Sequence, residues 1–313
     1  MVAIWIRRDA ASGNPITLML RFDPSELRKY AGLTLLARRV VEGFLTGVHR
    51  SPYKGASIEF AEHRQYTPGD EIRHIDWRAF GKTDKYFIKE YEEETNLKSY
   101  LLVDASGSMG YRGKSKQPTK FEFAQQVAAS LAFLMLHQLD AVGLITHDTK
   151  IRRIIPPKAS PKHLLNVLKA LEATKPGGET SMAPLWHQLA THQLKRRGMI
   201  IIISDFFDDL EALTKALRHL KYRNHEVILF HVLAPEEIEF PFSRMTQFRD
   251  LETAGENVRV DARRWREEYL RNFENFREQL RQRTGNMHMD YCLLRTDQPV
   301  DRALGHYLSR RPQ

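Results

Sequence analysis

The chain has 313 residues, which is enough for one large domain with an elaboration or for two domains of ordinary size. Its hydrophobic fraction of 42% and charged fraction of 28% are typical of a soluble globular protein. The formal net charge of +9 favours anionic partners, but no dense block of lysine and arginine interleaved with aromatic residues accompanies it. The charge therefore predicts a solvated basic surface, and no nucleic-acid partner is expected.

The single cysteine, Cys292, excludes an intrachain disulfide and leaves too few thiolates for a zinc site. It lies in MDYCLLR, which reads as a buried strand, so Cys292 is interpreted as a small core side chain. No apolar run at the start is long enough for a secretory signal, and the longest runs elsewhere have the length of a strand. We therefore expect a cytoplasmic protein with no integral membrane segment.

Residues 1–95 are predicted to form an N-terminal helix and a small β-rich elaboration. Residues 24–45 repeat apolar side chains every three to four positions, which predicts a helix capped near Ser25. After residue 46, turn signals such as YTPGD and FGKTDK separate segments with strand-like alternation: SIEFAE, IRHIDWRAF and YFIKEYEEE. Their polar residues favour a salt-bridged, solvated β surface.

From residue 96 to 313 the pattern alternates between strands and helices. Four continuous apolar runs predict strands buried on both faces: YLLV (100–103), VGLIT (142–146), MIIII (199–203) and EVILFHV (226–232). Helices are expected near 119–140, 161–174, 182–196 and 208–222. This alternation predicts an α/β fold with a doubly wound, mostly parallel sheet. KIRRII (150–155) follows a tight turn and is expected to be an antiparallel edge strand.

An insertion at about 234–284 is expected to interrupt this alternation. Prolines and a candidate hairpin in 234–260 precede a long helix, predicted over 261–284. One stripe of that helix is expected to pack onto the chain's own sheet: Trp265, Tyr269, Phe273, Phe276 and Leu280. MHMDYCLLR then predicts the last strand, and DRALGHYLSRR predicts a closing helix.

The stretch DASGSMG follows the first strand of the sheet, at the edge where α/β proteins bind ligands. It lacks the spacings of phosphate-binding loops and the G-x-S-x-G context of a serine nucleophile. Asp104, Ser106 and Ser108 are alternate residues whose oxygens can converge on one hard cation such as Mg²⁺. Thr180 in KPGGETSM and Asp205 after MIIIIS are expected at the same edge. These five residues are the candidate metal site.

The order D-x-S-x-S, loop threonine and strand-end aspartate resembles the metal-ion-dependent adhesion site of von Willebrand factor type A domains. The upstream block, GVHRSPYKGASIEFAEHRQYTPGDEIRHIDWRAF followed by KYFIKEYEEETNL, resembles family 58 of the domains of unknown function. Members of that family are type A-like proteins often encoded beside MoxR-type AAA+ ATPases. This chain departs from the family pattern at Glu179, which stands between the glycines and the threonine.

The resemblance implies a role for each of the five residues. Ser106, Ser108 and Thr180 would be hydroxyl ligands, directly or through water, whereas Asp104 and Asp205 would act largely through bound water. Each residue also has an ordinary alternative, because aspartate, serine and threonine cap helices and hydrogen-bond to loop amides.

A cation held by few protein charges keeps an open coordination position, which an acidic side chain from a partner can fill. We therefore expect a noncatalytic, Mg²⁺-dependent protein-interaction module, with Mn²⁺ or Ca²⁺ as alternative ions. The resemblance implies an adaptor or cofactor of a MoxR-type AAA+ ATPase in protein assembly or maturation. The alternative is a metal-dependent hydrolase, because His147 and Asp148 follow the strand expected next to Asp104.

Overall fold

The computed structural model describes residues 98–310, apart from 114–115, 179–180, 195–196, 250 and 253–256. Before residue 98 it describes only residues 33, 36–37, 40–41, 60–65, 77, 80–81 and 86–91. The chain divides into two compact units: residues 1–17 with 50–96, and residues 18–49 with 97–313.

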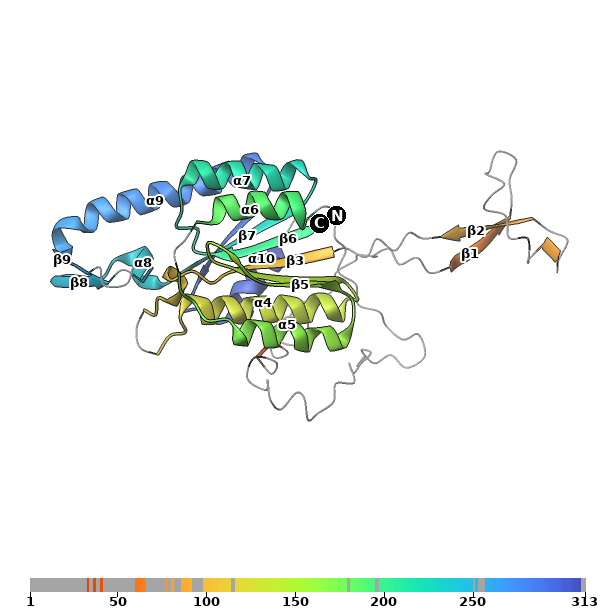
Figure 1. Ribbon diagram of the computed structural model, residues 1–313, viewed down its shortest axis with the longest axis horizontal. Coiled ribbons are helices and arrows are strands. Elements are labelled where there is room, and N and C mark those ends of the chain that lie inside the picture. Colours follow the sequence, from red (N-terminus) through yellow and green to blue (C-terminus); the bar gives the residue numbers. More distant parts are fainter. Residues whose placement is uncertain are drawn as a thin grey trace. The chain divides into compact units, whose positions relative to one another are not determined.

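In the smaller unit, β1 (Phe60–Gln65) pairs with β2 (Phe87–Tyr91) as an antiparallel ribbon (Figure 1). The two strands overlap the predicted strands SIEFAE and YFIKEYEEE. The prediction of a strand at 72–80 is wrong at its two described residues, Trp77 and Phe80, which are helical. Their rings meet edge to face with centroids 6.2 Å apart, as three-residue spacing on one helix face permits.

The larger unit is built on a six-stranded sheet in the order β10-β7-β6-β3-β4-β5. Its strands are β3 (Lys98–Asp104), β4 (Ala141–His147), β5 (Ile151–Lys158), β6 (Met199–Ser204), β7 (Glu226–Leu233) and β10 (Asp290–Arg295). Every neighbouring pair is parallel except β4–β5, which is antiparallel. The predicted doubly wound, mostly parallel sheet and its antiparallel edge strand are thus confirmed.

Helices cover both faces of this sheet, which is why the central strands are continuous apolar runs. Figure 1 shows α6 (Met182–His192) and α7 (Leu210–Tyr222) on one face, and α4 (Lys120–His137) and α5 (Pro161–Ala173) on the other. The chain closes with α10 (Val300–Arg310). Among the described residues, every helix is too short or too polar to cross a membrane. The described residues of the predicted helix 24–45 are helical, and Ala37 and Val41 are buried.

The segment between β7 and β10 carries additional elements. It contains the short helix α8 (Pro235–Glu239), the antiparallel hairpin of β8 (Met245–Arg249) and β9 (Asn257–Asp261), and the long helix α9 (Ala262–Asn286). Figure 1 shows α8 and the hairpin together at one end of the larger unit. The predicted hairpin and the predicted long helix are both confirmed.

Two predictions about packing near the end of the chain are confirmed only in part. The stripe of α9 is buried at Phe273 and Leu280, but Trp265 is 53% exposed. Only part of the stripe is therefore covered, with α7 and β10 among the elements that α9 contacts. Cys292 is partly exposed, because β10 is an edge strand with one neighbour in the sheet.

Candidate metal centre

Two of the predicted residues, Asp104 and Asp205, lie at the ends of neighbouring strands. Asp104 is the last residue of β3, and Asp205 directly follows β6, which pairs with β3 in parallel. Both side chains are fully buried. Burial, and next the negative charge of Asp205, raise the pKa of Asp104 to about 7. Two buried carboxylates that repel each other in this way are stabilised by a cation.

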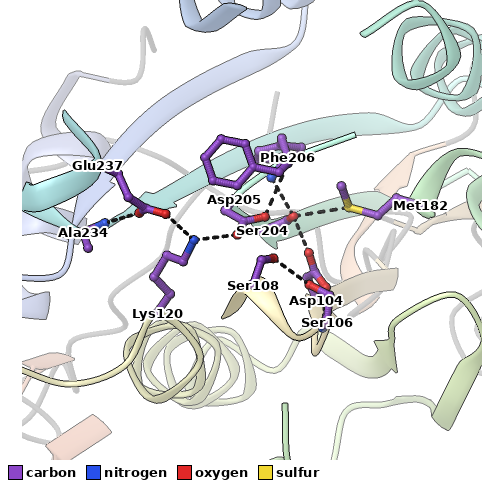
Figure 2. A network of polar contacts seen from close by, with 11 residues as sticks. Asp104, Ser106, Ser108, Lys120, Met182, Ser204, Asp205, Phe206, Ala234 and Glu237 are labelled. Atoms are coloured by element: carbon purple, nitrogen blue, oxygen red, sulfur yellow. Dashed lines mark hydrogen bonds and ion pairs between the residues drawn. The ribbon is translucent and has the colours of Figure 1, made fainter. Parts of the chain in front are cut away.

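The serines of the loop DASGSMG (104–110), called the first loop below, are arranged around Asp104. One oxygen of the carboxylate, Oδ1, accepts a hydrogen bond from the backbone N–H of Ser106 at 2.9 Å, and Oδ2 accepts one from the hydroxyl of Ser204 at 2.6 Å. The hydroxyl oxygens of Ser106 and Ser108 lie 3.1 Å apart (Figure 2). Oxygens this close can share one hard cation. The cation itself stays a prediction.

The glycine-containing loop predicted to carry Thr180 lies against the first loop. The N–H of Gly177 donates to the carbonyl of Ala105 at 3.0 Å, and the N–H of Gly107 donates to the carbonyl of Gly178 at 2.8 Å. Gly178 has a φ of +83°, which favours glycine. The structure therefore brings the two loops together, as the site requires. Thr180 itself lies outside the described residues, so its role as a ligand stays a prediction.

Arg152 fixes the glycine-containing loop. Its guanidinium donates to the Asp148 carboxylate at 2.6 Å and to the carbonyls of Lys175 and Gly177 at 2.5 Å each. A rigid planar fork that bonds two carbonyls and a carboxylate holds a loop in one position. Asp148, one of the two residues behind the hydrolase alternative, is therefore engaged in positioning this loop.

His147, the other residue behind that alternative, is fully buried at the end of β4. Its ring lies edge-on to Trp186, with centroids 6.4 Å apart. Neither ring nitrogen has a hydrogen-bond partner among the described residues. Burial lowers the pKa of His147 to about 4, so the imidazole is neutral at neutral pH.

The chain bends sharply after Asp205. Phe206 has a φ of +54°, a left-handed conformation that is costly for a bulky side chain. The Phe206 ring is fully buried, and its N–H donates to the hydroxyl of Ser204 at 2.9 Å. Packing and this hydrogen bond together hold the strained turn that directs Asp205 into the site.

A lysine that the sequence analysis did not select completes the polar network in Figure 2. Lys120 is the first residue of α4, and its ammonium Nζ donates to Asp205 Oδ2 and to Glu237 Oε1, both at 2.6 Å. Its side chain is 1% exposed. Burial by itself lowers the pKa of Lys120, but the carboxylates of Asp205 and Glu237 outweigh it and raise the pKa. The ammonium is therefore charged.

The sequence-based prediction of the site did not include three residues of this network: Ser204, Lys120 and Glu237. The question is which of them the sequence could have indicated. Ser204 carried a signal, because it is the polar residue that ends the apolar run of β6. Lys120 carried a weaker one, because a cation at the first position of a helix is unfavourable unless something compensates. Glu237 carried none, because its role depends on how α8 folds back to the sheet.

The donor set is suited to a hard cation. Two aspartates and two serine hydroxyls offer only oxygen, which fits Mg²⁺ and not the sulfur and nitrogen sites typical of zinc. Within the part of the chain that the structure describes, no three His, Cys, Asp or Glu side chains form a metal-binding group. Hydroxyls, water and an external ligand would therefore complete the coordination.

The comparisons with known proteins agree with the family resemblance. The family model described as "Protein of unknown function DUF58" matches residues 62–279. The chain is 28% identical over 223 residues to "Uncharacterized protein Rv1480" of Mycobacterium tuberculosis, covering 70% of this chain and 68% of that protein.

Among solved structures, the chain is similar to BatB from Bacteroides thetaiotaomicron, with 15% identity and a TM-score of 0.45. That match covers 68% of this chain and 98% of BatB. It is also similar to a von Willebrand factor type A protein from Catenulispora acidiphila, with 10% identity and a TM-score of 0.41, over 69% of this chain and 43% of that one.

Proposed function

The chain belongs to the DUF58 family of proteins of unknown function, and from that premise we propose that it is a noncatalytic, Mg²⁺-dependent protein-interaction module. The observation that carries the proposal is a cluster of oxygen ligands at one edge of the sheet. Asp104 and Asp205 are buried at the ends of neighbouring strands. The hydroxyls of Ser106 and Ser108 lie 3.1 Å apart on the same loop as Asp104. Thr180 is included in the proposal as a further ligand.

The chemistry of the site explains why metal and partner would depend on each other. Mg²⁺ keeps several of its positions for water or for groups from another molecule. A carboxylate from a partner protein can displace such a water and neutralise the remaining charge. Mn²⁺ or Ca²⁺ would serve in the same way. When bound here, Mg²⁺ would supply the positive charge, and the aspartates and serines of this chain would hold the ion.

The partner we propose is a MoxR-type AAA+ ATPase, for which the chain would be an adaptor in protein assembly or maturation in the cytoplasm. The support is the resemblance of the upstream block to a family often encoded beside such ATPases. Capture of the ATPase by the immobilised chain is expected with Mg²⁺ and is expected to be lost with EDTA or in Asp104→Ala. Capture unchanged by both treatments would exclude a metal-dependent contact.

Mg²⁺ is expected to raise the melting temperature of the wild-type chain, because a ligand that binds only the native state stabilises it. At Mg²⁺ about tenfold above the dissociation constant, the shift is expected to be about 3 °C or more. Ser106→Ala is expected to abolish the shift, since it removes a hydroxyl ligand. Differential scanning fluorimetry measures it.

Ser130→Ala is the matched control for Ser106→Ala. Ser130 is also buried, but it lies in α4 and donates to the carbonyl of Gln126. Its loss should leave the Mg²⁺ shift unchanged. An equal shift in wild type and Ser106→Ala would show that the ion binds elsewhere.

A further inference from the structure

The Lys120 ammonium occupies a cation site built by the chain itself. Besides the carboxylates of Asp205 and Glu237, it faces two aromatic rings: the centroid of Phe207 is 5.0 Å away and that of Tyr111 is 5.9 Å away. Aromatic faces attract cations, so four groups surround one charge. We infer that Lys120 is a tethered resident cation, which competes with the divalent ion for Asp205 and links the site to α8 through Glu237.

The position of Lys120 is energetically unfavourable for a positive charge. At the first residue of α4 the charge lies at the positive end of the helix dipole. Its side chain is 1% exposed, and removing an ammonium from water costs several kcal/mol. An apolar side chain would avoid both costs. Packing alone therefore does not account for a charge here, whereas neutralising Asp205 does.

The charges around the site show what this ammonium would do to metal binding. Asp104, Asp205 and Glu237 bring three negative charges when ionised, and Lys120 brings one positive charge, which leaves a net charge of −2. Replacing Lys120 by a neutral residue would leave −3. Since Asp205 is both a Lys120 partner and a proposed metal residue, the ammonium weakens the attraction for a second cation. This inference rests on the proposed function and deepens it.

Glu237 extends the same network into the insertion. Its Oε2 accepts a hydrogen bond from the N–H of Ala234 at 2.7 Å, and its backbone carbonyl accepts one from the Tyr269 hydroxyl at 3.0 Å. Glu237 thus connects Lys120 to α8 and α9. Leu251, which follows β8, also touches the first loop, because its carbonyl lies where a side chain on Gly107 would be. Competition at Asp205 would therefore be felt by the insertion beside the site.

The test is isothermal titration of Mg²⁺ into the full chain. Lys120→Met removes the charge and keeps an unbranched side chain, so Mg²⁺ is expected to bind about tenfold tighter or more. Glu237→Gln removes a negative charge and should weaken Mg²⁺ binding. Lys162→Met removes an exposed lysine of α5 as the matched control and should leave binding unchanged. Disruption of the fold would weaken Mg²⁺ binding in both site variants. Tighter binding by Lys120→Met together with weaker binding by Glu237→Gln therefore identifies the effect of charge.

Each outcome decides between the inference and the function on which it rests. Equal or weaker Mg²⁺ binding by folded Lys120→Met, with binding by wild type, overturns the inference and leaves the proposed function standing. Binding by Lys120→Met alone supports the inference and overturns Mg²⁺ dependence in the wild type. No binding by either overturns both. If Lys120→Met does not fold, Glu237→Gln decides, provided that its circular dichroism spectrum matches that of the wild type: weaker Mg²⁺ binding by the folded variant supports the inference, and equal or tighter binding overturns it.

Discussion

Asp205→Ala is expected to lower the free energy of unfolding by about 3 kcal/mol in the presence of EDTA. The substitution leaves the buried ammonium of Lys120 with Glu237 as its remaining ionic partner. Removing one member of a buried ion pair typically costs about 3–5 kcal/mol, and the remaining partner places this case at the lower end. Urea denaturation followed by circular dichroism measures the change.

Two further variants separate this cause from a general loss of packing. Lys120→Met and Glu237→Gln combined with Asp205→Ala remove all three charges of the network, so the triple variant should be more stable than Asp205→Ala alone by about 1 kcal/mol or more. Glu268→Ala removes an exposed carboxylate of α9 and should change stability by about 0.5 kcal/mol at most. A triple variant less stable than Asp205→Ala would mean that the ammonium is not the source of the loss.

Much of the sheet could be predicted because its central strands are continuous apolar runs. The run MIIII predicted a strand covered on both faces, because each of its side chains is apolar. In the structure every residue of β6 is buried. The antiparallel β5 could be predicted from the short turn before it, which is too short for a parallel crossover. Trp265 and Cys292 were wrongly placed, because periodicity shows which side chains share a face and not how far the covering elements extend.

The first loop and Asp205 could be located because of where strands end. In a parallel sheet, the residues after neighbouring strands meet at one edge, so Asp104 and Asp205 were expected together, as found. The contacts of Lys120 could not be found in this way. Lys120 bonds to Asp205, which is 85 positions away in the chain, and to Glu237, which is 117 positions away. No local sequence pattern specifies pairs so far apart. The sequence thus predicted the candidate ligands but not the charge that compensates them.

The buried histidines make stability depend on pH in a way that one substitution isolates. Burial lowers the pKa of His147 to about 4 and that of His231 to about 3, below the ordinary value near 6.5. Between about pH 6.5 and 4, the unfolded chain therefore binds protons at these positions and the folded chain does not. Each such histidine lowers the free energy of unfolding by about 1.4 kcal/mol for every unit of acidification.

Two acids, the buried Asp104 and the partly buried Asp140, oppose this effect, so the wild-type slope alone is not the test. Burial raises the pKa of Asp104 to about 7 and that of Asp140 to about 6, and these groups favour the folded chain as the pH falls. His147→Leu removes one histidine contribution and leaves the others. Its stability relative to wild type is expected to improve by about 2 kcal/mol between pH 6 and pH 4.5.

Urea denaturation in EDTA at several pH values between 7 and 4.5 measures this difference. His192→Leu is the control, because His192 is exposed at the end of α6. Its stability relative to wild type should stay nearly constant across the same range. A His147→Leu curve parallel to the wild-type curve would mean that the folded chain already admits a proton at His147. That result would require water or an acidic group to reach the His147 ring beside Trp186. His147 ends β4, which pairs with β3, the strand that leads into the first loop.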